Sequence, residues 1–226
     1  MIKRLSFLFL GMAMATACSA GGNGTPAAPA AAATPAAPAA TVTEGTDYVA
    51  TTTAGRYAPK DKVEVVEVFS YGCIHCAHYE EYVEKLQKEL PKGATFHAVP
   101  AAFNDAWLPY AQAFYAAKKL NVSPEAHAAL FKAIHVEHYP LRTVEELADW
   151  YHQHYAVDAQ KFITTANSDE VKNQILADSK LIQGWGIDGT PTIVVNGKYR
   201  SNQIQTFDQL NDVAKFLANR ELNGGK

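Results

Sequence analysis

Two short runs of β-branched residues, far apart in the chain, enclose a long stretch in which apolar residues recur at helical spacing. Residues 63–69 and 192–195 are rich in valine and isoleucine and are bounded by turn residues, a pattern typical of strands. Residues 94–99 form another predicted strand, and residues 48–51 form a candidate edge strand. From about residue 106 to residue 185, the periodicity predicts only helices.

Helices are also predicted outside that stretch. Residues 74–90 place apolar side chains at every third or fourth position, and the Pro-Lys-Gly sequence that follows is a stop signal. Residues 206–219 repeat this amphipathic pattern near the C-terminus. The dipeptide Asn196-Gly197 follows the last β-branched run and predicts the tight turn of a hairpin.

The predicted order is strand, helix, strand, a helical block of about eighty residues, hairpin and helix. A βαβ start and a ββα end are the two halves of a thioredoxin fold, and the block between them is too long for a simple crossover. We therefore expect an α/β protein with a thioredoxin fold and a large all-helical insertion. The first half should span residues 44–104, the insertion residues 105–185 and the second half residues 186–220.

Composition and charge exclude some functions. The chain has 226 residues and a formal net charge of −3, and no run of basic residues supports binding to nucleic acid. After the N-terminal segment, no apolar stretch approaches the roughly 18 residues of a transmembrane helix.

The first residues have the pattern of an export signal. Lys3 and Arg4 precede a short apolar segment, so residues 1–17 are predicted to be a signal peptide. The small residues before Cys18 resemble a bacterial lipoprotein cleavage site, which would make Cys18 the lipidated first residue of the mature protein. Ala15 stands where such sites usually have leucine, and ordinary signal-peptidase cleavage is the alternative.

The segment after Cys18 is rich in alanine and proline, so residues 18–43 cannot bury enough apolar surface to fold by themselves. They are predicted to be an extended linker that holds the folded part away from a membrane. A tolerated tail without any lipid explains the same composition.

The candidate chemistry lies in Cys73-Ile74-His75-Cys76, between a predicted strand and a predicted helix. At a helix N-terminus, unpaired backbone N–H groups and the helix dipole favour the thiolate form of a cysteine. A thiolate both attacks disulfides and leaves from them. Two cysteines three residues apart can form a disulfide and open it again.

Other interpretations of these residues remain. The cysteine pair is a candidate half of a zinc site, or a static disulfide. His135 with His138, and His152 with His154, are candidate ligands of a second metal, although solvated or capping roles are more usual for such histidines. The aromatic residues of the helical block suit either a substrate groove or a core.

The chain resembles the DsbA family of periplasmic disulfide oxidants over residues 44–220. The resemblance consists of a Cys-x-His-Cys motif after a strand ending in Phe-Ser, then a helical insertion, then Gly-x-x-Gly-Thr-Pro-Thr followed by Val-Asn-Gly-Lys-Tyr. It implies a redox-active disulfide and no further cofactor or metal. It also implies a monomer in the periplasm of a Gram-negative bacterium, here anchored through Cys18.

The resemblance also implies a role for each matching residue. Cys73 would be the exposed attacking cysteine and Cys76 the buried resolving one, and His75 would stabilise the Cys73 thiolate. A cis Pro191 would pack beside the disulfide, and the backbone of Thr190 would bind an extended substrate peptide. The two acidic residues that match positions beneath the active site, where they assist proton transfer at Cys76, are Glu67 and Glu80. A simple half-exposed position on the strand is the alternative for Glu67.

Two positions depart from the family pattern. Ile74 stands where the best-studied members have proline, which puts the strength of oxidation in question. His97 occupies the strand that often provides a lysine near Glu67, so the acid–base partner of Glu67 is in question too.

We therefore expect an enzyme that donates the Cys73–Cys76 disulfide to the thiols of newly exported proteins. The family implies that a quinone-linked, DsbB-like membrane protein then reoxidises it. Two alternatives are a reducing or isomerase-type oxidoreductase of the same fold and a lipid-anchored binding or chaperone module whose cysteines are incidental.

Overall fold

The computed structural model describes residues 41–58 and 61–225. The predicted signal peptide, Cys18 and all but the last three residues of the predicted linker lie outside these residues.

A five-stranded mixed sheet forms the centre of the fold, with the strand order β1-β5-β4-β2-β3. β2 pairs in parallel with β3 and antiparallel with β4, while β5 pairs antiparallel with both β4 and β1. All predicted strands are present, and their bounds are β1 Tyr48–Ala50, β2 Val63–Phe69, β3 Ala94–Pro100, β4 Thr192–Val195 and β5 Tyr199–Ser201. β2 lies in the interior of the sheet, between β4 and β3, and all seven of its residues are buried, including Glu64 and Glu67.

Seven helices accompany this sheet in the described part of the chain. Their bounds are α1 Ile74–Glu89, α2 Leu108–Lys119, α3 Glu125–His135, α4 Val144–Tyr155, α5 Ala159–Ala166, α6 Asp169–Gly184 and α7 Phe207–Leu222. Side chains cap the N-termini of three consecutive helices: Thr143 and Glu146 form a capping box at α4, and the Asp158 and Ser168 side chains cap α5 and α6.

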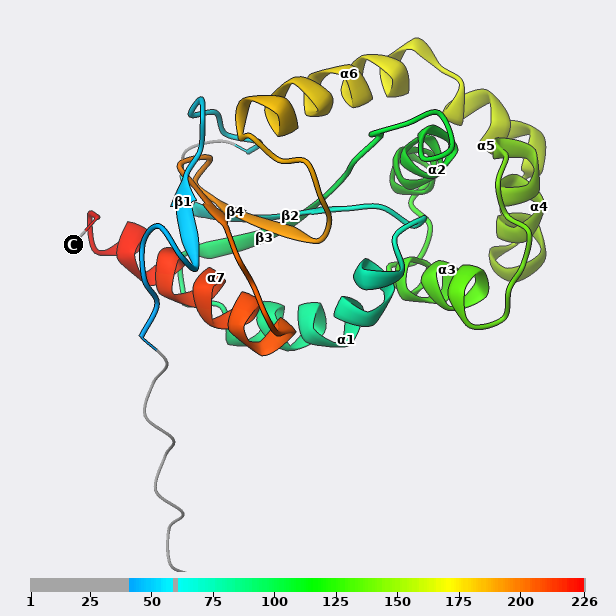
Figure 1. Cartoon of the computed structure of the whole chain (residues 1–226). Coiled ribbons are helices and arrows are strands. Elements are labelled where there is room, and N and C mark those ends of the chain that lie inside the picture. The colour runs from blue at the N-terminus through cyan, green and yellow to red at the C-terminus, as the bar shows by residue number, and fades with distance from the viewer. Residues whose placement is uncertain (1–40, 59–60, 226) are drawn as a thin grey trace, which may run out of the picture. The chain divides into compact units, whose positions relative to one another are not determined.

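The two faces of the sheet are covered by different helices (Figure 1). α1 and α7 pack together on one face, over a core that includes Val65, Ile193 and Leu217. α6 covers the other face, where Trp185 is completely buried with Val66 and Val194. The alternation of side chains along β2 therefore sends neighbouring residues into two separate cores.

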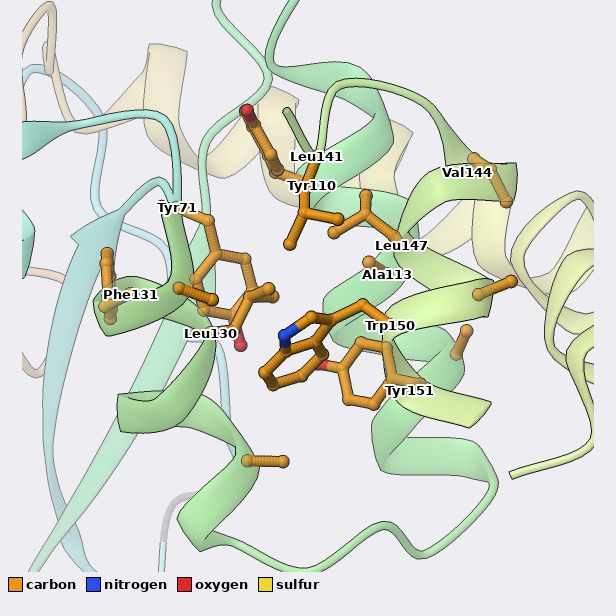
Figure 2. Packing of buried hydrophobic residues seen from close by; sticks show 14 of the residues in the cluster. Tyr71, Tyr110, Ala113, Leu130, Phe131, Leu141, Val144, Leu147, Trp150 and Tyr151 are labelled. Atoms are coloured by element: carbon orange, nitrogen blue, oxygen red, sulfur yellow. The ribbon is translucent and has the colours of Figure 1, made fainter. Parts of the chain in front are cut away.

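Five helices, α2 to α6, follow one another between β3 and β4. α2 to α5 surround a core of their own, and Figure 2 shows Tyr71, from the turn that precedes α1, pointing into it. Of the aromatic residues predicted for either a groove or a core, Tyr110, Trp150 and Tyr151 are buried here. The core interpretation is therefore confirmed for these three residues.

The hairpin between β4 and β5 contains the predicted tight turn. Asn196 and Gly197 both have positive φ angles, 52° and 61°, as a type I′ turn requires. A Cβ atom on Gly197 would lie only 1.7 Å from the carbonyl oxygen of Gly55. Glycine is therefore required here for the close approach of two backbone segments as well as for the turn.

None of the helices within residues 41–58 and 61–225 has both the length and the apolar character needed to cross a bilayer.

Candidate functional site: a dithiol at a helix N-terminus

Cys73 is the N-cap residue of α1, directly after the turn that ends β2. Its backbone is extended, with φ −98° and ψ 114°, and its carbonyl oxygen accepts the first helical hydrogen bond, from the N–H of Ala77. The first turn of α1 contains no acidic residue. The positive end of the helix dipole is therefore not compensated by a side-chain carboxylate, and it favours a negative charge on Cys73.

The surroundings of Cys73 strongly favour its thiolate. A hydrogen bond from the Cys76 thiol, with further hydrogen bonds from the Thr190 side chain and the backbone N–H groups of Cys76 and His75, lowers the pKa of Cys73 to about 5 despite burial. In the thiol form, the sulfur donates to the carbonyl oxygen of Thr190, with a sulfur–oxygen distance of 3.4 Å. Cys73 is thus ionised at neutral pH.

Cys76 has the opposite preference. It is completely buried, and burial, followed by the contact with Cys73 and the charge of Glu67, raises the pKa of its thiol far above the usual value. Both cysteines are free thiols in the structure. One helical turn therefore carries a thiolate and a protonated thiol in contact with each other.

The expected contrast in exposure between the two cysteines is smaller than predicted. Cys73 is only 8 % exposed, so the prediction of an exposed sulfur is wrong in degree. The sulfur lies against Thr190 and belongs to the same core cluster as Tyr71 and Tyr110. A sequence motif places a cysteine at a helix end but does not reveal which distant segments cover it.

Two carboxyl groups lie beneath the dithiol. Glu67, on β2, is only 1 % exposed, and burial, then the charges of Glu80 and Cys73, raises the pKa of its carboxyl well above the usual value. The predicted burial of Glu67 is confirmed, and the half-exposed alternative is wrong. Glu80 lies one helical turn after Cys76 on α1, and burial with the charge of Glu84 raises the pKa of Glu80 to about 7.

Two histidines were linked to the site from the sequence, His75 in the motif and His97 on β3. The His75 side chain is exposed, and its contribution to the Cys73 thiolate comes from its backbone N–H. His97 pairs with Val66, whereas Glu67 pairs with Ala98. Paired residues of parallel strands share a face, so His97 and Glu67 point to opposite faces of the sheet and His97 is not the partner of that carboxyl.

The Thr190–Pro191 segment adjoins Cys73 from the far end of the sequence. The peptide bond between these residues is cis, as the resemblance implies. Both residues are partly exposed, so a peptide can reach their backbone. The Thr190 hydroxyl is buried and has no hydrogen-bond partner elsewhere in the described part of the chain.

Tyr71 and His127 lie next to the site but were not predicted from the sequence to be part of it. The Tyr71 hydroxyl lies 2.6 Å from Nδ1 of His127 on α3, and Nε2 of His127 lies 3.6 Å from a carboxyl oxygen of Glu80. His135, also on α3, donates to the carbonyl oxygen of Tyr71 at 2.7 Å. His127 belongs to no motif, and only the helical periodicity around it gave a signal.

His135 is thus a structural donor, and His152 lies 2.9 Å from the carbonyl oxygen of Val157 through its Nδ1. Within the described ranges, no group of three His, Cys, Asp or Glu side chains is arranged to hold a metal ion.

Known proteins are similar to this chain in both sequence and fold. The sequence model of the thioredoxin family matches residues 51–214. The thiol:disulfide interchange protein DsbA of Pseudomonas aeruginosa is 39% identical over 158 residues, which cover 70% of this chain and 74% of that protein. The protein of the same name from Burkholderia cepacia is 37% identical over 207 residues, covering 91% of this chain and 90% of that protein.

A solved structure shows the same relationship. The crystal structure of Pseudomonas aeruginosa DsbA matches with a TM-score of 0.75 and 35% identity, covering 80% of this chain and 95% of that one. The predicted fold, a thioredoxin fold with a helical insertion, is thereby confirmed.

Proposed function

Since this chain belongs to the DsbA family of thiol:disulfide oxidoreductases, we propose how each residue of its site takes part in disulfide donation. The enzyme is a periplasmic thiol:disulfide interchange protein. The observation that supports the roles below is the pairing of an ionised Cys73 with a buried, protonated Cys76 on one turn of α1.

In the first step, a substrate thiolate attacks Sγ of Cys73 in the oxidised enzyme. The Cys73–Cys76 bond breaks, a mixed disulfide forms between substrate and Cys73, and Cys76 leaves as a thiolate that takes up a proton. In the second step, another substrate thiolate attacks the substrate sulfur of that mixed disulfide. Cys73 leaves as a thiolate, and the substrate gains a disulfide while the enzyme gains two electrons.

The low pKa of Cys73 makes the second step favourable, because a stable thiolate is a good leaving group. The proton that Cys76 needs in the first step comes from the carboxyl pair Glu67 and Glu80, both of which have raised pKa values because of burial. The backbone beside Pro191, at Thr190, binds the substrate as an extended segment next to Cys73. The His75 side chain is exposed, and the backbone N–H of His75 stabilises the Cys73 thiolate.

The redox equilibrium with glutathione tests this role. We expect the purified protein to have a reduction potential well above the roughly −270 mV of thioredoxin, because the reduced form holds a stabilised thiolate. The fraction of enzyme with alkylatable Cys73, measured across ratios of reduced to oxidised glutathione, gives the potential. A value close to that of thioredoxin would indicate that Ile74 has shifted the balance and that the protein acts as a reductase.

The segment before residue 41 completes the proposal. Residues 1–17 act as a signal peptide, Cys18 carries lipid, and residues 18–43 link it to the catalytic part, which acts as a monomer on exported thiols and is reoxidised by a DsbB-like membrane protein. The small residues before Cys18 support this. We expect the mature protein to partition with membranes and to become water-soluble after Cys18→Ala. An intact mass without any acyl group on Cys18 would contradict the anchor.

A further inference from the structure

A cavity of about 710 Å³ opens between α1, β3, α2 and α3, and neither cysteine is among its lining residues. Glu80, Tyr71 and His127 all form part of its wall. Glu67, in contrast, is only 1 % exposed and is not among the residues that line the cavity. Glu80 is therefore the carboxyl of the pair that meets both the buried site and an open, water-accessible space.

His127 is held tightly beside Glu80. Its ring lies among the rings of Phe69, Tyr71 and Phe131, with centroid distances of 5.0, 5.1 and 5.3 Å. Nδ1 is in hydrogen-bond contact with the Tyr71 hydroxyl, and Nε2 faces Glu80. Burial lowers the pKa of His127 to about 4, so the ring is neutral at neutral pH and carries a single N–H group.

The direction of the hydrogen bond between the Tyr71 hydroxyl and Nδ1 is linked to which ring nitrogen carries that proton. Burial raises the pKa of Tyr71 well above the usual value, so its hydroxyl keeps a proton to donate. When the hydroxyl donates to Nδ1, the ring proton resides on Nε2 and points toward Glu80. Nε2 and the carboxyl oxygen are 3.6 Å apart, so a movement of a few tenths of an ångström would bring them within hydrogen-bond distance.

Other charged and titratable groups also face Glu80 or the cavity. They are Glu67 on β2, Glu84 on α1, His97 on β3, Lys118 on α2, Glu125 on α3 and Tyr151 on α4. The charge of Glu84 acts with burial to raise the pKa of Glu80, which opposes ionisation. An N–H group donated by His127 would oppose that effect, because a donor to a carboxylate stabilises its charged form.

We propose that His127, oriented by Tyr71, is a positioning residue that holds the Glu80 carboxyl at the cavity so that the proton exchanged by Cys76 passes between the buried dithiol and solvent. The inference rests on the proposed function, in which Glu67 and Glu80 exchange that proton. It adds the route from Glu80 to water and the residue that keeps Glu80 able to titrate at neutral pH.

The step that reports this route is the closure of a mixed disulfide by Cys76. Cys76 loses its proton to the carboxyl pair, its sulfur forms a bond to Sγ of Cys73, and the bond from Cys73 to glutathione breaks. Glutathione leaves as a thiolate, and the carboxyl pair releases the proton through the cavity. The number of electrons is conserved, because one disulfide replaces another.

The test is the pH profile of that closure in the full-length protein. Reduced enzyme is mixed with saturating glutathione disulfide, and the first-order release of glutathione is followed between pH 5.5 and 9. We expect His127→Phe to move the inflection upward by about one pH unit and to slow closure at pH 7 by about fivefold, because less Glu80 is ionised. His127→Gln, which restores an N–H group toward Glu80, should return the rate to within about twofold of the original.

Two further variants separate a loss of the donor from a disturbance of the packing. Phe131→Leu disturbs the same aromatic cluster without removing a donor, and it should leave the inflection in place. Tyr71→Phe removes one oxygen atom and should shift the inflection in the same direction as His127→Phe. An unchanged inflection in either His127→Phe or Tyr71→Phe, or an equal shift in Phe131→Leu, would overturn the inference.

Glu80→Gln distinguishes a failure of the His127 proposal from a failure of the proposed proton-transfer role of Glu80. Loss of the inflection in this variant supports the proposed role of Glu80. If Glu80→Gln abolishes the inflection while His127→Phe does not move it, the role of His127 alone is wrong. If Glu80→Gln keeps the inflection, the proton-transfer role of Glu80 in the proposed function fails, and the inference fails with it.

Discussion

Cys73→Ser is expected to abolish disulfide donation, whereas Cys76→Ser is expected to leave a protein that becomes trapped on its substrate. A serine hydroxyl forms no disulfide, and the low pKa that makes Cys73 reactive belongs to its thiol. In Cys76→Ser, the Cys73 thiolate still attacks disulfides. The buried group that would release the mixed disulfide is then missing.

The measurement is the oxidation of a reduced two-cysteine peptide, followed by mass spectrometry without reductant. With this peptide and the oxidised enzyme as reference, Cys73→Ser should give the rate seen without enzyme. Cys76→Ser is mixed instead with the disulfide form of the peptide, which its Cys73 thiolate attacks, and it should give a covalent adduct of enzyme and peptide. His78→Ser, an exposed change on the same helix, is the matched control and should keep full activity. Persisting function in Cys73→Ser would favour the binding or chaperone alternative.

The relative stability of the two redox forms is expected to reverse between acidic and neutral pH. Cys73 has a folded-state pKa of about 5, below its ordinary value of about 8.5, so its contribution to stability is present at high pH and is lost as the pH falls through 5. At pH 7, two units above the folded pKa, it amounts to about 3 kcal/mol. Closing the four-residue loop with a disulfide contributes only about 2 kcal/mol.

The reduced form should therefore be the more stable one at pH 7, by about 1 kcal/mol, and the oxidised form by about 2 kcal/mol near pH 4.5. Urea unfolding of both forms at each pH measures the difference. Comparing the forms at the same pH removes most of the contribution from other titrating groups. An oxidised form that stays more stable throughout would mean that the Cys73 thiolate is not stabilised by the fold.

Local patterns were sufficient to predict most of this architecture. The β-branched run at residues 63–69, the Thr143 capping box and the Asn196-Gly197 turn each act through neighbours in sequence, so the sequence alone carries their signal. The site was predicted where a motif marked it, at Cys73 and Cys76. The burial of Glu67 was predicted because that residue lies on the strand directly before the motif.

The errors concern contacts between segments that are far apart in the chain. The register of β2 against β3 puts His97 and Glu67 on opposite faces, and a shift by one residue would have reversed this. The partial burial of Cys73 depends on Thr190, which is 117 positions away. His127 approaches Glu80 through the packing of α3 on α1, which periodicity indicates only as an apolar face.

The turn before Cys73 is held in place by residues of the helical block. α3 holds Tyr71 at two points, through His135 at its carbonyl oxygen and His127 at its hydroxyl. A Cβ atom on Gly72 would lie 2.9 Å from Nε1 of Trp107, just before α2. Residues of the helical block thus fix the conformation of the turn that carries Cys73. An attempt to trim this chain to a minimal thioredoxin would remove the supports of its own reactive cysteine.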